Sequence, residues 1–204
     1  MAPPRNLRRR NALADAAIEI LGTAGIHKLS HRAVDEQAGL PVGTASNYFA
    51  CRDDLLKAAV SRVAELQLAR MTSADSQVTG PVGADQLAEL IGSNLYRSAT
   101  EDRVRSLALY ELTLEASRQP ELAQEMTRLG ADALTATIAE HRALGLPTTP
   151  DQVQALMTLF GGVLLSLVTG PLEAVTRPAV LALAQCLVNG VLNSSPVAGE
   201  ARLP

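Results

Sequence analysis

The sequence predicts an all-α protein of about nine helices. Apolar residues recur at helical spacing, beginning with Leu13, Ala17, Leu21 and Ala24, and no stretch shows the strict alternation of a half-buried strand. Glycine and proline fall between these periodic segments, where helices end and begin. The 204 residues are 47% apolar and 19% charged, which is typical of a chain that folds around a core.

We expect four helices in the first seventy residues. Gly25 ends the first helix, and Ser30 is a suitable N-cap for the second. Gly39 supplies a left-handed turn, and Pro41 suits the first position of the third helix. The expected ranges are about 13–24, 31–38, 41–49 and 52–70.

Five further helices are expected after a linker at 72–84 that is rich in small and polar residues. Thr149, Pro150 and Gln152 form a capping box with proline at the first helical position. The expected ranges are about 85–98, 101–118, 120–143, 150–170 and 176–192. We therefore divide the chain into a front domain at 1–50, a connecting helix at 51–71 and a rear domain at 72–204.

Charge is distributed unevenly along the chain. Residues 1–62 carry nine Lys/Arg against six Asp/Glu, whereas the remainder carries nine against fifteen. This difference indicates that only the front domain meets a polyanion. The two cysteines, Cys51 and Cys186, have no zinc-binding spacing and are expected to be free thiols of a cytoplasmic protein. The uncharged segments 152–172 and 178–199 are too rich in polar residues for membrane spans.

The second and third expected helices, joined by a short glycine turn, favour a helix-turn-helix that binds DNA. Thr44, Ser46 and Asn47 are small and polar enough to approach base edges in the major groove, and Phe49 is expected to anchor the third helix. The alternative is a helix hairpin with a polar exposed face. The full set of candidate DNA-binding residues is Arg8, Ser30, His31, Arg32, Val42, Gly43, Thr44, Ser46, Asn47, Tyr48 and Arg52.

The front domain resembles the DNA-binding domain of TetR-family transcriptional repressors over about fifty residues. The matching motifs are Gly25, Ser30, Ala38-Gly39-Leu40, Gly43-Thr44, Tyr48-Phe49 and Arg52-Asp53-Asp54-Leu55. Ser46 stands where the family commonly has tyrosine, Arg52 where it usually has lysine, and Pro41 where it usually has a small capping residue.

The resemblance implies a homodimeric repressor on a palindromic operator, with the last two long helices at the dimer interface. The lack of charge in these helices is also typical of burial on two sides, although a monomer with two central core helices would show it too. The expected interface residues are Leu156, Gly161, Leu164, Leu165, Val168, Leu183, Leu187 and Val191.

The resemblance further implies a small-molecule effector that binds in the rear domain and releases the protein from DNA. The candidate ligand-binding residues are Tyr96, Arg103, Leu107, Tyr110, Leu114, Met126, Met157 and Phe160, although such stripes are often plain core. Glu111 and Glu115, together with Arg103, are more typical of a solvated face.

Two other classes of function are disfavoured by the sequence. The chain has none of the phosphate-loop, dinucleotide-binding, nucleophile-elbow or Glu-x-x-His patterns, so we expect no enzyme, cofactor or metal. A non-specific architectural DNA-binding protein is expected to be basic all over, whereas the rear domain here is acidic.

Overall fold

The computed structural model describes residues 4–74 and 82–193 and confirms the all-α fold class. Within these ranges the chain forms nine α-helices and two short 3-10 turns, and no strand. Along the chain the helices fall into two groups, before and after residues 75–81.

The first group contains α1 (Pro4–Ala24), α2 (His31–Gln37), α3 (Thr44–Tyr48) and α4 (Arg52–Ala74). Ser30 is the N-cap of α2, as predicted, and its Oγ accepts a hydrogen bond from the N–H of Ala33 at 3.2 Å. The prediction that α3 begins at Pro41 is wrong. The N-cap of α3 is Gly43, with φ of 92°, so residues 41–43 belong to the turn.

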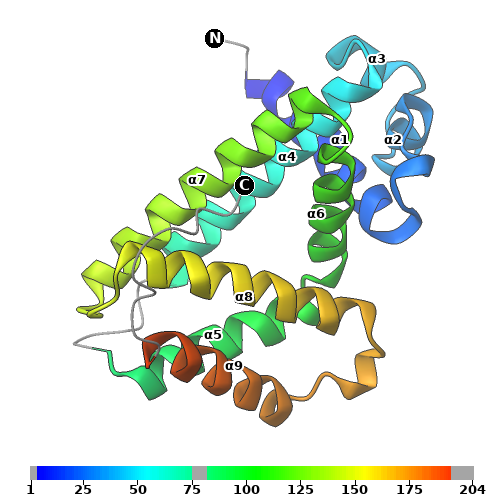
Figure 1. Cartoon of the computed structure of the whole chain (residues 1–204). Coiled ribbons are helices and arrows are strands. Elements are labelled where there is room, and N and C mark those ends of the chain that lie inside the picture. Colours follow the sequence, from blue (N-terminus) through cyan, green and yellow to red (C-terminus); the bar gives the residue numbers. More distant parts are fainter. Residues whose placement is uncertain (1–3, 75–81, 194–204) are drawn as a thin grey trace.

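The second group contains α5 (Ala84–Ala99), α6 (Arg103–Ala116), α7 (Pro120–Ala143), α8 (Pro150–Thr169) and α9 (Arg177–Leu192). The capping box of α8 is present, with Gln152 N–H donating to Thr149 Oγ1 at 3.2 Å and Thr149 N–H donating to Gln152 Oε1 at 3.0 Å. In Figure 1, α2 and α3 lie at one end of the molecule and α5, α8 and α9 at the other, with α6 and α7 packed beside α1 and α4 between them. Helix α7 runs beside α4, and α6 crosses towards α1.

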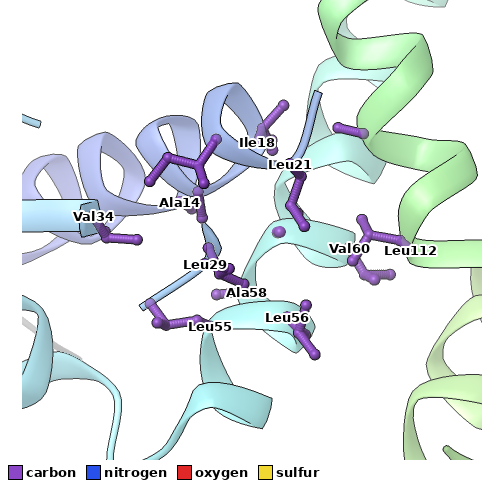
Figure 2. Packing of buried hydrophobic residues seen from close by; sticks show 14 of the residues in the cluster. Ala14, Ile18, Leu21, Leu29, Val34, Leu55, Leu56, Ala58, Val60 and Leu112 are labelled. Carbon is purple, nitrogen blue, oxygen red and sulfur yellow. The ribbon is translucent and has the colours of Figure 1, made fainter. Parts of the chain in front are cut away.

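The division into a front domain and a rear domain is not a division of the hydrophobic core. One buried cluster includes Leu13 of α1, Val34 of α2 and Leu55 of α4, and it continues into Leu112 of α6 and Leu122 of α7. Figure 2 shows Leu112 approaching Val60 of α4 across this boundary. Because each such side chain stabilises the fold by roughly 1.5–3 kcal/mol when buried, α6 is part of the support of the front helices.

The boundary between the two groups falls a little later than predicted. Helix α4 continues through Ala74, so residues 72–74 of the expected linker are helical, and α5 begins at Ala84. Residues 75–81 of that linker lie outside the described residues. Helix ends that are predicted from sequence alone differ by a few residues from the structure, because helices fray at their ends and the last turn depends on tertiary contacts.

Candidate nucleic-acid interface

The turn between α2 and α3 is held from inside by Asp35, a residue that sequence reasoning did not single out. Asp35 is fully buried. Its Oδ2 accepts from the N–H of Gly43 at 2.7 Å, and its Oδ1 accepts from the N–H of Ala45 at 2.6 Å. The carboxylate therefore fixes both the left-handed glycine and the first turn of α3. In the sequence, the signal for this role is that Asp35 is an acidic residue eight positions before Gly43.

The predicted base-reading residues lie on the outer side of this turn and of α3. Ser46 and Asn47 are exposed, and Thr44 is half-buried. The hydroxyl of Thr44 donates to Pro41 O at 2.6 Å, and that of Ser46 donates to Gly43 O at 2.9 Å. Val42 is the most prominent side chain of the turn, with 82% of its surface exposed.

The two aromatic residues at the end of α3 attach it to α1. Phe49 is 2% exposed inside the core cluster, as predicted for an anchor, and the guanidinium of Arg10 lies 5.2 Å from the centre of its ring. The Tyr48 hydroxyl, predicted to contact a phosphate, donates to Asn6 Oδ1 at 2.6 Å. Asn6 and Arg10 lie one turn apart, so α1 and α3 are joined along one edge.

The other phosphate-contact candidates divide into free and occupied side chains. Arg8 and Arg32 are exposed. The Oγ of Ser30 caps α2, and the Nε2 of His31 is 2.9 Å from Phe49 O, so His31 joins the start of α2 to the end of α3. Arg8 and Arg32 can reach a phosphate without breaking a contact, whereas Ser30 and His31 have structural partners.

Arg52, a candidate for DNA contact, has partners inside the molecule, although 38% of its side-chain surface is exposed. Its Nη2 donates to Ile26 O at 2.7 Å and its Nε donates to Leu29 O at 3.3 Å, while Nη1 lies 3.9 Å from Glu115 Oε1 on α6. The N–H of Ile26 donates to Glu111 Oε2 at 3.2 Å. Glu111 and Glu115 thus face the front helices and are not a solvated face. We call these three side chains with the 26–29 backbone the α6 latch.

A close approach of backbones reinforces the contact between α1 and α6. A Cβ added to Gly22 would lie 2.0 Å from Val104 O and 2.7 Å from Val104 Cγ1. Only glycine fits at this crossing, because the nearest atom belongs to the backbone of Val104 and could move aside only if the helix shifted. The first helix therefore contacts the first turn of α6 directly, and the α6 latch contacts its later turns.

Two candidate ligand-binding residues tie α6 to α8 instead of lining an open space. The Tyr110 hydroxyl donates to Gly161 O at 2.6 Å, and burial raises the pKa of Tyr110 to about 12. The guanidinium of Arg103 donates to Leu167 O at 3.4 Å and to Gly170 O at 3.0 Å. These contacts hold the start and the middle of α6 against α8 and the turn that follows it.

The remaining ligand candidates have varied surroundings. Tyr96, Leu107 and Phe160 pack against a second buried cluster, and the guanidinium of Arg177 lies 4.6 Å from the centre of the Tyr96 ring. Met126 packs against the front cluster, Met157 is half-buried, and Leu114 is 59% exposed.

Two surface hollows, of about 420 and 230 Å³, contain none of the eight candidates. The larger one lies where α1, α4 and α6 meet, between Asp15, Arg62 and Asp102. The smaller one lies beside Lys57 and Glu121, which form an ion pair between α4 and α7.

The predicted interface residues are found on both sides of α8 and α9. Leu165 and Leu183 are each 42% exposed, and Gly161 is half-buried. The other five are buried within the single chain, because these helices also pack against α5, and they are Leu156, Leu164, Val168, Leu187 and Val191. By length and composition α8 is the one helix in the described ranges that would pass for a membrane span.

A comparison with known families decides the identity of the fold. Residues 82–191, more than half of the chain, match the family model described as the C-terminal domain of tetracyclin repressor-like proteins. This chain belongs to the TetR family of transcriptional regulators. The family match covers the rear domain, and the motifs of about fifty front-domain residues resemble the DNA-binding domain of the same family.

Solved TetR-family structures agree with this assignment. A family member from Streptomyces coelicolor is 29% identical, with 91% of this chain and 98% of that chain covered and a TM-score of 0.65. The multidrug binding protein EbrR, in complex with ethidium, is 30% identical over 92% of this chain and 99% of that one, with a TM-score of 0.65. A transcriptional regulator from Rhodococcus shows the same fold at 19% identity, with coverages of 90% and 95% and a TM-score of 0.70. No curated protein matches the chain in sequence.

Proposed function

We propose that this TetR-family regulator is a cytoplasmic, homodimeric repressor that binds a palindromic operator and is released by a small-molecule effector. The observation that carries the proposal is the fixed turn and exposed outer face of α3. Asp35 holds the turn from the buried side, and Asn47 presents a free amide on the other. An asparagine amide can bond adenine bidentately in the major groove.

The basic residues around α3 support DNA as the partner. Arg8, Arg9 and Arg10 project from the first turns of α1, and Arg32 projects from α2. Phosphate contacts of this kind set the position of the helix-turn-helix on the duplex, while α3 and its turn read the bases. In this proposal residues 1–50 bind DNA, residues 51–71 connect, and residues 72–204 bind the effector and the partner subunit.

The surface of α8 and α9 supports dimerisation. Four of the seven large apolar residues that are strongly exposed in the described ranges lie on α8, on α9 or between them, and they are Leu159, Leu165, Leu172 and Leu183. The neighbouring exposed residues Gly162, Ser166 and Gly190 are small enough for close helix approach. A cluster of exposed leucines beside uncharged small residues is typical of an interface between subunits.

The ties between α6 and α8 suggest how an effector acts. EbrR, which is similar over nearly its whole length, binds ethidium and malachite green, so we propose a small organic effector for this chain also. An effector that enters among Leu107, Tyr110 and Phe160 would displace the bonds that join α6 to α8. The α6 latch and the Gly22 crossing would then carry the movement of α6 to the front helices.

The effector can lower operator affinity at most by the factor by which it binds the moved state more tightly than the DNA-binding state. Two recognition helices must lie about 34–36 Å apart to enter successive major grooves on one face of DNA. A coupling free energy of about 1–3 kcal/mol between the effector site and the DNA site would change operator affinity roughly 5–150-fold.

Selection of bound DNA from a random pool tests the proposal. We expect a palindrome to be recovered, bound at least about 10³-fold more tightly than random DNA in the same salt. Asn47→Ala should reduce this ratio, whereas Arg32→Ala should weaken binding to specific and random DNA alike. Recovery of no preferred sequence, with undiminished binding to random DNA, would instead favour an architectural protein.

A further inference from the structure

Val42 is an apolar side chain in the place where the structure presents its most accessible recognition surface. With 82% of its surface exposed, it is the most exposed of the large apolar residues in the described ranges. It precedes Gly43 in the turn between α2 and α3, and no side chain of residues 4–74 or 82–193 covers it. Because its side chain stays in water, Val42 adds almost no hydrophobic stabilisation to the fold.

The side chain is held in one place before any partner arrives. Gly39 and Gly43 bracket the turn with φ of 64° and 92°, and the Asp35 carboxylate binds the Gly43 N–H from the buried side. The N–H of Thr44 donates to Pro41 O at 3.1 Å, which closes the turn around Val42. Because valine is branched at Cβ, its χ1 is also restricted. The isopropyl group is therefore a rigid apolar projection.

The neighbours of Val42 on this surface are polar and partly occupied. The hydroxyls of Thr44 and Ser46 already donate to backbone carbonyls, and Asn47 lies farther along α3. In the major groove the C5-methyl group of thymine is the apolar feature of the base edges, and apolar side chains contact it.

We propose that Val42 reads the C5-methyl group of one thymine in each half of the operator. This inference rests on the proposed function, because it requires α3 and its turn to enter the major groove. It makes Val42 a specificity-determining residue by shape and hydrophobicity, beside the hydrogen bonds of Asn47. The contact buries one methyl group of Val42 against the thymine methyl group and leaves no polar group unpaired. Its contribution to operator affinity is therefore lost when the thymine methyl group is removed.

The test removes the thymine methyl group from the DNA, or the isopropyl group of Val42 from the protein. Deoxyuridine replaces each thymidine in turn in one half of the selected operator, and affinities are measured for the wild type, Val42→Ser and the control Leu114→Ser. Leu114, on α6, is likewise an exposed large apolar residue. Circular dichroism checks that both variants fold, as expected for substitutions at exposed positions. Burial of one methyl group corresponds to about a fourfold change in affinity.

We expect one thymine per half-site whose demethylation weakens the wild type and Leu114→Ser about fourfold, and leaves Val42→Ser unchanged. Specific operator binding that is insensitive to demethylation at every thymine would overturn the inference and leave the proposed function intact. Equal sensitivity in the wild type and Val42→Ser would also overturn it, because another residue would then contact the methyl. Failure to select any preferred sequence would overturn the proposed function itself.

Discussion

At the scale of single residues, the buried carboxylate of Asp35 holds the turn between α2 and α3 and the first turn of α3. The carboxyl group is fully buried and accepts hydrogen bonds from two backbone N–H groups, and no other group in the turn bonds these donors. Hydrogen bonds to a charged acceptor contribute about 1.5–3 kcal/mol each, and a buried donor left without a partner adds its own desolvation cost.

Asp35→Asn is therefore expected to lower the free energy of unfolding by about 2 kcal/mol, because the amide can accept one bond but places an N–H₂ group against the other donor. Urea unfolding measures this change. Glu36→Gln, the exposed neighbour on α2, is the matched control and should change stability by less than about 0.5 kcal/mol. Equal effects at both positions would show that the Asp35 bonds contribute little.

His141 gives the protein a predictable response to acid. It is 7% exposed near the end of α7, its Nδ1 lies 3.0 Å from Thr148 Oγ1, and burial lowers its pKa from the ordinary value of 6.5. The unfolded chain then binds a proton at a higher pH than the folded chain does. The stability should therefore fall as the pH drops from about 6.5 through the lowered pKa.

Thermal unfolding midpoints between neutral pH and about pH 5 measure this response. The decrease should be smaller in His141→Gln, which cannot gain a proton. His27, which is exposed, supplies the matched control, since His27→Gln should retain the full decrease of the wild type. A wild-type decrease that persists in His141→Gln would assign the acid sensitivity to other groups.

At the scale of helices, α6 is the element that couples the two groups. It contacts α1 at Gly22, the 26–29 backbone through the α6 latch, and α8 through Arg103 and Tyr110. Each contact is directional, so a displacement of α6 has to be followed by the front helices or has to break specific bonds.

Replacing Arg52 by lysine tests the α6 latch. Lysine offers one ammonium in place of a guanidinium that bonds both Ile26 O and Leu29 O, so we expect a loss of about 1 kcal/mol in unfolding free energy and weaker operator binding. Arg118→Ala is the control, because Arg118 also pairs with Glu115, at 3.7 Å, but its side chain is 69% exposed. The inward role of Arg52 would be contradicted if both variants behaved alike in urea unfolding and DNA titration.

Gly22→Ala should damage the crossing of α1 and α6. The added methyl would lie 2.0 Å from Val104 O, so the helices must separate, at an expected cost of about 2–4 kcal/mol. Gly130→Ala on α7 is the matched control, because a Cβ there meets nothing within 4 Å, and it should raise stability by up to about 1 kcal/mol. Chemical denaturation compares the two, and a neutral Gly22→Ala would show that α1 and α6 slide freely past each other.

At the scale of the whole molecule, sequence periodicity predicted where the helices lie better than it predicted which residues they contact. Proline and capping residues located the start of α7 and α8 because those signals are local. Asp35 bonds residues only eight and ten positions farther along the chain, so its role had a weak local signal. The inward bonds of Arg52 join residues that are 23 and 26 positions apart, so no local pattern could reveal them. For the same reason Leu164, expected at the interface, is 6% exposed inside the chain, since α5 covers that side of α8.

In the proposed dimer, two copies of α3 are held at a fixed separation by contacts through α8 and α9. The most direct test is the ratio of affinities for the selected palindrome and for random DNA, measured for the wild type, Leu183→Arg and the control Leu114→Arg. Leu183 and Leu114 are both exposed, on α9 and α6 respectively.

We expect the wild type and Leu114→Arg to sediment as dimers and to keep a ratio of about 10³ or more. Leu183→Arg should sediment as a folded monomer, with a ratio that falls at least tenfold because one α3 reads only half of the site. A folded Leu183→Arg monomer that retains the full ratio, or a wild type with a ratio near one, would contradict the account.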